Sequence, residues 1–352
     1  MTQLRLPAEQ QYQAELNALV ANDSAEKPYG WRLSPRAVLL YITGGQCGDI
    51  NITPKYIGHK RLVEIAIATL QTDRGLLLTG DPGTAKSWLS EHLCAAITGQ
   101  STNVIQGTMG TDESQIKYGW NYAMLIANGP TPDALIKSPV YTAMENGGLI
   151  RFEEISRCAG EVQDALIGIM SEKLLPIPEL SQTVQAARGF NIIATANTRD
   201  RGIHTMSAAL KRRFNTVILP SPETPQIEQE IVTVRVAQLS QHLPLTAKPP
   251  NDETIAKVIK IFRELRAGAS DKEKFKQPSS PMSTAEAISL LINAMALSSG
   301  FGDGNINDSD LAAGLHGAIV KEEQDAAIFK EYLDIVIKHR DKPLYTACRE
   351  LV

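Results

Sequence analysis

Residues 76–87, LLLTGDPGTAKS, constrain the fold of this 352-residue chain more than any other stretch. Three leucines in a row are typical of a buried parallel strand, and a turn rich in small residues follows them. The next segment, SWLSEHLCAAITG, places Leu89, Leu93 and Ile97 at helical spacing and ends at Gly99, a favoured residue just past a helix. The sequence therefore predicts a strand, a glycine-rich turn and a helix in direct succession.

This succession of elements is the one that builds a phosphate-binding site. Backbone N–H groups of the turn and the positive end of the helix point to one place, where phosphate oxygens are held. We expect Lys86 to add a charge on the outer phosphates, and Ser87 to place its hydroxyl on a magnesium ion. The residues expected to contact the nucleotide are Gly80, Asp81, Pro82, Gly83, Thr84, Ala85, Lys86, Ser87 and Trp88.

Ala85 departs from the usual phosphate-loop pattern, which has glycine immediately before the lysine. Alanine adds one methyl group and permits helical backbone, so we expect the loop to survive with Ala85 at the helix entry. An ordinary strand-to-helix turn is the alternative interpretation. Lysine followed by serine at the helix start, after two correctly spaced glycines, disfavours that alternative.

Two adjacent carboxylates end another apolar segment, LIRFEEISR, at Glu153 and Glu154. The carboxyl ends of parallel strands form the edge where ligands bind in open α/β sheets. Glu153 is therefore expected to hold the hydration shell of magnesium, and Glu154 to orient or deprotonate the attacking water. A strand that ends in a solvated charge pair is the alternative. Arg151 lies inside the apolar part and requires a partner if it is buried.

Two further groups of polar residues follow along the chain. The segment FNIIATANTRD predicts a buried strand with Asn197 at its end, where it would hold the attacking water or the terminal phosphate. Capping of the next turn is the alternative role for Asn197. Later, a helix ends in Lys211, Arg212 and Arg213, just before a last strand at 216–219.

Composition limits the class of protein. The chain is long enough for two domains, because single cores stop growing near ~250 to 300 residues. No apolar run approaches the ~18 residues of a membrane span, and MTQLRLPAEQQ lacks the apolar core of a signal peptide, so we expect a cytoplasmic protein. Four scattered cysteines indicate neither a zinc site nor a disulfide framework. A net charge of -4 argues against a large nucleic-acid footprint.

The order of segments predicts three parts. Residues 1–52 form an N-terminal helical extension without readable chemistry, in which residues 8–21 have the spacing of one helix. Residues 53–220 form the α/β nucleotide-binding domain. Residues 221–352 carry helical patterns only, including a capping box between Ser283 and Glu286. Within the second part, residues 108–137 are long and irregular in polarity, and a loop punctuated by prolines is expected after a helix at 161–172.

Together these motifs resemble those of AAA+ ATPases, and in particular the MoxR family, whose phosphate loop often reads GxPGxAK[ST]. GDPGTAKS resembles Walker A, LIRFEE resembles Walker B, and FNIIATAN resembles the sensor 1 strand. The run KRRF resembles the arginine-finger position, with Arg213 as the better match and Arg212 as the second. Residues 108–137 resemble the insert that marks this clade.

The resemblance implies a five-stranded parallel P-loop AAA+ core with a C-terminal all-helical lid. It also implies Mg²⁺-dependent ATP hydrolysis in a homo-oligomeric ring, commonly a hexamer, that serves as a molecular chaperone or remodelling motor. Members of that family usually act with a protein partner bearing a von Willebrand factor A domain. Two positions depart from the pattern. Glu153 replaces the Walker B aspartate, and Ala285 stands where the sensor 2 arginine would lie, so the lid loses one grip on the nucleotide.

Two other functions fit the same fold. A nucleic-acid motor would need an electropositive pore, whereas this acidic chain has no basic tract beyond KRRF. An ATP-binding switch with low turnover is made plausible by Glu153 and Ala285. A steady-state ATPase assay with and without candidate partners separates the three functions.

Overall fold

The computed structural model describes residues 5–197 and 206–351. Its contacts divide the chain into two compact units. The first comprises residues 1–81 and 85–219, and the second comprises residues 82–84 and 220–352.

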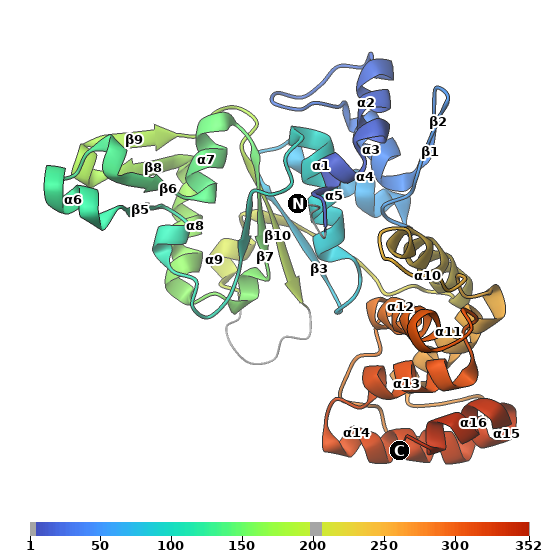
Figure 1. Ribbon diagram of the computed structural model, residues 1–352. Coiled ribbons are helices and arrows are strands. Elements are labelled where there is room, and N and C mark those ends of the chain that lie inside the picture. Colours follow the sequence, from blue (N-terminus) through green and yellow to red (C-terminus); the bar gives the residue numbers. More distant parts are fainter. Residues whose placement is uncertain (1–4, 198–205, 352) are drawn as a thin grey trace. The chain divides into compact units, whose positions relative to one another are not determined.

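A five-stranded parallel sheet is the centre of the first unit (Figure 1). All neighbouring strands in it run parallel. The prediction of a five-stranded parallel α/β core is therefore confirmed. Because parallel strands end at one edge, the ends of the strands that carry the motifs lie together. The strand order is β11 (Phe214–Ile218), β3 (Gly75–Gly80), β10 (Asn191–Asn197), β7 (Leu149–Glu153) and β4 (Val104–Gln106).

Helices cover both faces of this sheet. Successive side chains of a strand point to opposite faces, so Leu76 and Leu78 enter one core while Leu77 enters the other. The first core is completed by α3 (Pro35–Thr43), α4 (Lys60–Leu70) and α5 (Lys86–Thr98). The second is completed by α7 (Pro139–Asn146) and α8 (Gly160–Glu172). The unit is thus a three-layer α/β/α sandwich.

The N-terminal segment belongs to the first of these cores. It contains α1 (Ala8–Gln11), α2 (Gln13–Asn22), α3 and a hairpin of β1 (Gly45–Cys47) and β2 (Ile50–Ile52). The sequence predicts a single helix over 8–21, but the backbone leaves helical geometry at Tyr12 and divides it. Tyr12, Leu16 and Leu19 pack into the core that contains α5.

A buried ion pair between Lys55 and Glu15 holds this segment against the first core. The Lys55 ammonium lies 2.5 Å from Glu15 Oε2 and faces the rings of Tyr12 and Tyr41 at 4.2 and 4.5 Å. Burial lowers the pKa of Lys55 to about 8, although the Glu15 carboxylate opposes this change. The backbone carbonyl of Lys55 also accepts a hydrogen bond from the indole of Trp88 on α5, so the N-terminal segment is joined to the phosphate-loop helix.

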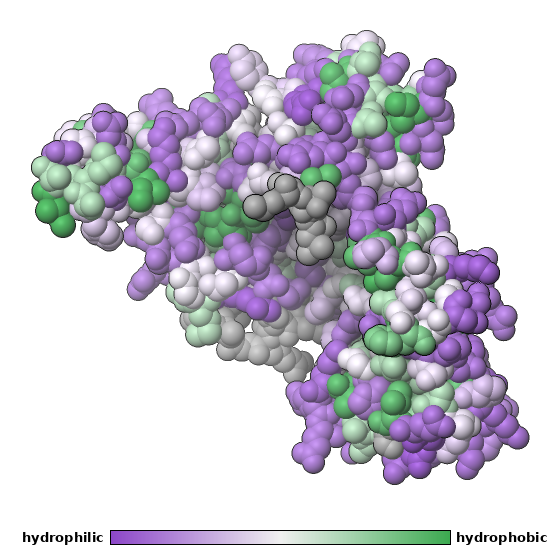
Figure 2. Space-filling view, in the orientation of Figure 1, coloured by the Kyte–Doolittle hydropathy of each residue, from purple (hydrophilic) through white to green (hydrophobic). Residues whose placement is uncertain are grey.

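The segment 108–137 is more regular than its sequence indicates. It folds into a hairpin of β5 (Tyr118–Trp120) and β6 (Leu135–Lys137), with α6 (Tyr122–Asn128) between the strands. Tyr122 and Ile126 of α6 are 75% and 86% exposed. Figure 2 shows apolar colouring at the tip where Figure 1 places α6.

A second hairpin, β8 (Leu174–Ile177) with β9 (Gln182–Gln185), replaces the proline-punctuated loop that the sequence predicts. That prediction is wrong because Leu175 and Ile177 alternate with exposed residues and fill the core beside α8. Burial of every second side chain favours a strand here more than the two prolines disfavour one.

The second unit is helical, as predicted. Ser283 and Glu286 form the predicted capping box at the start of α12 (Thr284–Phe301). Glu228 is fully buried and accepts hydrogen bonds from Arg263, Arg266 and Thr284. The other helical elements are α10 (Pro225–Ser240), α11 (Asp252–Ala267), α13 (Asp308–Ile319), α14 (Glu323–Tyr332), a π turn at Leu333–Ile337, α15 (Lys338–Arg340) and α16 (Lys342–Arg349).

Within the described ranges, α12 is the one helix long and apolar enough, by length and composition alone, to cross a membrane. Core helices of soluble proteins meet the same criteria, and Leu290, Leu291 and Ala294 of α12 lie in the core of the second unit. We therefore interpret α12 as a core helix, and the expectation of no membrane span stays a prediction.

Candidate active site

The predicted strand–turn–helix succession is present, with β3 ending at Gly80 and α5 beginning at Lys86. The Lys86 ammonium is buried at this turn. It donates hydrogen bonds to the backbone oxygens of Gly80 (3.0 Å) and Asp81 (2.8 Å). Two carbonyl groups of the turn thus hold the lysine, which is itself the first residue of α5, the helix end whose N–H groups can bind an anion.

The conformation of Ala85 differs from the expectation. Its φ of 64° and ψ of 25° are left-handed, not helical. The expectation of helical backbone was wrong because the chain turns sharply at this residue before α5 begins. A left-handed alanine brings its Cβ close to the following carbonyl, which costs ~1 to 2 kcal/mol.

We expect the substitution Ala85→Gly to raise the free energy of unfolding by ~0.5 to 1 kcal/mol. Glycine removes the left-handed penalty of ~1 to 2 kcal/mol, and the greater freedom of the unfolded chain offsets part of this gain. Chemical denaturation measures the change. Ala68→Gly, at an exposed position inside α4, is the matched control and should lower the stability by ~1 kcal/mol. Equal losses in both variants would refute the left-handed conformation of Ala85.

Glu153 lies at the carboxyl end of β7 and is only 3% exposed. Its Oε2 accepts hydrogen bonds from Ser87 Oγ (2.6 Å) and Thr195 Oγ1 (2.7 Å). Burial alone would raise the pKa of Glu153, but hydrogen bonds from Ser87, Ser90 and Thr195, with the charge of Arg151, lower it. Glu153 is therefore a buried, ionised carboxylate and not part of a solvated charge pair.

This donor set suits magnesium. No cluster of three or more His, Cys, Asp or Glu side chains capable of binding a metal occurs in residues 5–197 and 206–351. Magnesium, however, usually keeps several waters and takes one or two oxygen donors from the protein. A serine hydroxyl 2.6 Å from an ionised carboxylate oxygen provides such donors at Ser87 and Glu153.

Glu154 follows directly, in a left-handed conformation with φ of 54°. Its backbone N–H donates to Thr195 Oγ1 (3.0 Å), and its carboxylate Oε2 lies 2.5 Å from Arg157 Nε. The side chain is 30% exposed, so water reaches it, unlike Glu153. The turn at Glu154 thus directs two adjacent carboxylates into different surroundings.

Asn197 ends β10 directly beside the phosphate loop. In the strand register it is the partner of Gly80, the last residue of β3. Thr195, which contacts both carboxylate-bearing residues, was not singled out from the sequence, although it lies on the same strand face as Asn197. Ser90 was also missed. It lies one helical turn after Ser87 and donates to Glu153 Oε1 (2.5 Å).

Arg212 and Arg213 lie at the amino ends of the parallel strands, whereas the phosphate loop lies at their carboxyl ends. They precede Phe214, the partner of Gly75 at the start of β3, whereas the loop follows the end of β3. Arg213 donates to Ser171 Oγ and to the carbonyl oxygen of Ala209, both at 3.0 Å, while Arg212 is exposed. Neither arginine therefore serves the phosphate loop of its own chain.

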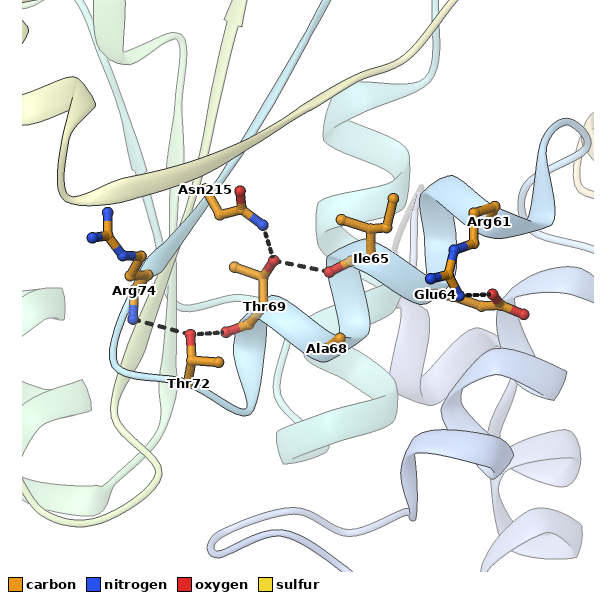
Figure 3. A pocket seen from close by; sticks show the side chains of 8 residues that line it. All are labelled: Arg61, Glu64, Ile65, Ala68, Thr69, Thr72, Arg74 and Asn215. Carbon is orange, nitrogen blue, oxygen red and sulfur yellow. Dashed lines mark hydrogen bonds and ion pairs between the residues drawn. The ribbon is translucent and has the colours of Figure 1, made fainter.

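A pocket of about 320 Å³ lies at this same end of the strands, and its lining residues come from α4, the α4–β3 connection and β11 (Figure 3). Arg74 on its wall donates to the backbone oxygen of Arg212. Asn215 donates to Thr69 Oγ1 (2.6 Å) across the pocket. The pocket thus borders the arginine segment and not the nucleotide loop. Its lining residues are Arg61, Glu64, Ile65, Ala68, Thr69, Thr72, Arg74 and Asn215.

Trp88 is expected to contact the nucleotide, but its side chain makes its contacts elsewhere. Its ring lies 4.3 Å from that of His92, and its indole N–H donates to the carbonyl oxygen of Lys55 (2.9 Å). The indole thus packs toward the N-terminal segment.

The strand β10, with Thr195 and Asn197, lies between the phosphate-loop strand β3 and the carboxylate strand β7. This order, followed by a helical unit, is the arrangement expected of an AAA+ ATPase, and comparison with known families shows that class. Residues 75–214 match the AAA domain (dynein-related subfamily), and residues 228–351 match the YehL-like AAA+ ATPase C-terminal domain. The chain is 42% identical to YehL of Escherichia coli (strain K12) over 94% of this chain and 91% of that protein. It belongs to the YehL-like AAA+ ATPases.

More distant similarities accompany this match. The protein SSP1341 of Staphylococcus saprophyticus is 28% identical over 57% of this chain and 72% of its own length. Among solved structures, NtrX from Brucella abortus in complex with ADP has a TM-score of 0.48 at 14% identity, covering 84% of this chain and 65% of that one. The Thermotoga maritima RuvB Holliday junction branch migration motor has a TM-score of 0.47 at 17% identity, covering 80% and 79%. Both structures are too distant to bear on function.

Proposed function

We propose that this protein hydrolyses Mg-ATP and uses the free energy to remodel a protein partner in the cytoplasm, as a MoxR-type AAA+ ATPase. One observation carries the proposal. A buried lysine, a serine hydroxyl and two adjacent carboxylates meet at one sheet edge, with Ser87 Oγ 2.6 Å from Glu153 Oε2. The sequence GDPGTAKS and the segment 108–137 support the MoxR assignment within the AAA+ class.

Nucleotide binding rests on the phosphate loop. Lys86 would exchange its bonds to the carbonyls of Gly80 and Asp81 for bonds to the outer phosphates. The N–H groups at the start of α5 would hold phosphate oxygens. Ser87 and Glu153 would hold magnesium, which when bound neutralises negative charge on the phosphates.

Hydrolysis requires a base beside the terminal phosphate. Glu154 is the more exposed of the two carboxylates and would orient a water and accept its proton during attack on the terminal phosphorus. To do so it must exchange its bond with Arg157 for one with that water. Asn197, level with the start of the loop, would hold the water or the terminal phosphate with its amide.

The position of Arg212 and Arg213 supports a ring. Both lie at the sheet edge opposite to the nucleotide loop of their own chain, so an arginine finger from this segment must act on another subunit. We therefore propose a homo-oligomeric ring, with six subunits as the expected number. A partner bearing a von Willebrand factor A domain is proposed from the resemblance to the MoxR family alone.

We expect Lys86→Ala to weaken ATP binding by ~10- to 10²-fold, because it removes a buried cation that makes charge-assisted hydrogen bonds. Equilibrium binding of a fluorescent ATP analogue measures this loss. Lys137→Ala is the matched control, since Lys137 is an exposed lysine paired with Glu145 and should leave the affinity unchanged. An unaltered ATP affinity in Lys86→Ala would defeat the phosphate-loop assignment.

The same preparation tests the function itself. Release of inorganic phosphate from ATP should require Mg²⁺ and should rise when a protein with a von Willebrand factor A domain is added. Stimulation by DNA in place of protein would instead favour a nucleic-acid motor. Tight ATP binding with no turnover under any of these conditions would indicate a switch.

A further inference from the structure

Arg151 is a buried arginine in the middle of β7, a strand that is otherwise apolar until Glu153. Two of its hydrogen bonds reach backbone oxygens on other segments. Nη1 donates to Ser101 O (3.0 Å), and Nη2 donates to Ser87 O (3.2 Å) in the first turn of α5. The planar guanidinium is therefore held against the phosphate-loop helix.

Two further hydrogen bonds of Arg151 reach the carboxylate of Glu153. Residues two apart on a strand share one face, so both side chains point toward α5. Nε and Nη2 of Arg151 lie 3.2 and 3.0 Å from Glu153 Oε1. Ser90 Oγ, which accepts from Arg151 Nε, donates to the same carboxylate oxygen at 2.5 Å.

The two oxygens of Glu153 consequently have separate partners. Oε1 receives Arg151 and Ser90, whereas Oε2 receives the hydroxyls of Ser87 and Thr195. Oε2 is thus the oxygen beside the hydroxyl expected to bind magnesium. Its position is fixed because the other oxygen is anchored.

A glutamate needs such an anchor more than an aspartate does. Its extra methylene adds a rotatable bond, so an unheld carboxylate at this position samples several orientations. A buried ion pair is weak evidence for stability, since an apolar residue at position 151 would fill the strand as well. The bonds of Arg151 are better explained by orientation of Glu153 than by stabilisation of the fold.

We propose that Arg151 is a positioning residue for the magnesium site: it anchors Glu153 Oε1 so that Oε2 faces the metal beside Ser87. The proposal rests on the function proposed above. Arg151 thereby lets a glutamate occupy the position where related phosphate-loop proteins use the shorter aspartate.

Binding of Mn²⁺ to the full-length protein saturated with ADP tests this role without reference to turnover, because electron paramagnetic resonance distinguishes free from bound Mn²⁺. We expect Arg151→Met to weaken Mn²⁺ binding by ~10- to 10²-fold, the usual effect of removing a partner of a metal ligand. ADP affinity in EDTA should change by less than ~3-fold on the same reasoning, since Arg151 is not expected to touch the nucleotide. Arg151→Lys keeps the charge but loses the planar fork, so it should fall between wild type and Arg151→Met.

The double variant Arg151→Met with Glu153→Asp is the decisive rescue. The shorter aspartate needs no anchor, so the Mn²⁺ affinity of the double variant should lie within ~3-fold of wild type. The single variant Arg151→Met should by contrast lose at least ~10-fold. Unchanged Mn²⁺ affinity in both Arg151 variants, or a double variant that regains thermal stability without regaining Mn²⁺ affinity, overturns the proposal. If Arg151→Met does not fold, Arg151→Lys and the double variant decide the matter alone. A wild-type protein that binds neither ADP nor Mn²⁺ would instead overturn the proposed function.

Discussion

Glu154→Gln should bind ATP with wild-type affinity and hydrolyse it ~10² to 10⁴ times more slowly. Glutamine keeps the size of the side chain and a hydrogen-bonding oxygen, but it cannot accept the proton of the attacking water. Phosphate release under saturating Mg-ATP gives the rate, and equilibrium binding of the ATP analogue gives the affinity. The left-handed turn at Glu154 is a backbone feature and should be unaffected by this change.

Two controls separate this role from the neighbouring contacts. Arg157→Gln removes the partner of the Glu154 carboxylate, so it should not reproduce the loss if the carboxylate itself is the base. Glu153→Gln should act differently, by raising the Mg²⁺ concentration needed for half-maximal turnover, because Glu153 is expected to hold the metal beside Ser87. A silent Glu154→Gln beside a strongly impaired Glu153→Gln would mean that the two carboxylates have the opposite roles.

The architecture could be predicted because it follows from local patterns. The apolar runs that become β3, β7 and β10 end in polar residues, and parallel strands must end at one edge. Those two facts suffice to bring Gly80, Glu153 and Asn197 together without knowledge of any side-chain contact. The helical second unit follows equally from periodicity and from the capping box at Ser283.

The details that escaped prediction depend on tertiary contacts. Nothing in the order of residues shows that Arg151 finds its partner two positions later, or that Ser90 and Thr195 complete that network. The left-handed backbone of Ala85 was missed for a related reason. Alanine favours helical geometry by propensity, and only the closure of the loop onto α5 forces the other conformation.

Arg213→Ala is expected to bind ATP normally and to hydrolyse it ~10³ to 10⁵ times more slowly, the range measured for arginines that stabilise charge on a transferring phosphoryl group. The reason is the position of Arg213 before β11, at the sheet edge opposite to the phosphate loop of its own chain. Arg212→Ala should be milder. Arg212 is the more exposed of the two and is therefore the alternative finger, so both variants are measured side by side. A larger loss of turnover in Arg212→Ala than in Arg213→Ala would assign the finger to Arg212.

The hydrogen bond between Arg213 and Ser171 allows a third variant that separates a structural role of Arg213 from a catalytic one. Its Nε donates to Ser171 Oγ on α8, a bond that an arginine acting on a neighbouring subunit must give up. Ser171→Ala removes this bond and leaves the guanidinium intact, so turnover should be retained. A loss in Ser171→Ala as large as in Arg213→Ala would show that Arg213 acts by supporting α8 and not as a finger.

Mixing two inactive variants gives the sharpest test of a shared site. An Arg213→Ala subunit still carries Glu154, and a Glu154→Gln subunit still carries Arg213, so a mixed ring contains interfaces where both groups are intact. Mixtures shown by native mass spectrometry to be hetero-oligomeric should therefore exceed the summed activity of their parents. Mixed rings no more active than the parents would count against catalysis between subunits, and full turnover in Arg213→Ala alone would exclude Arg213 as the finger.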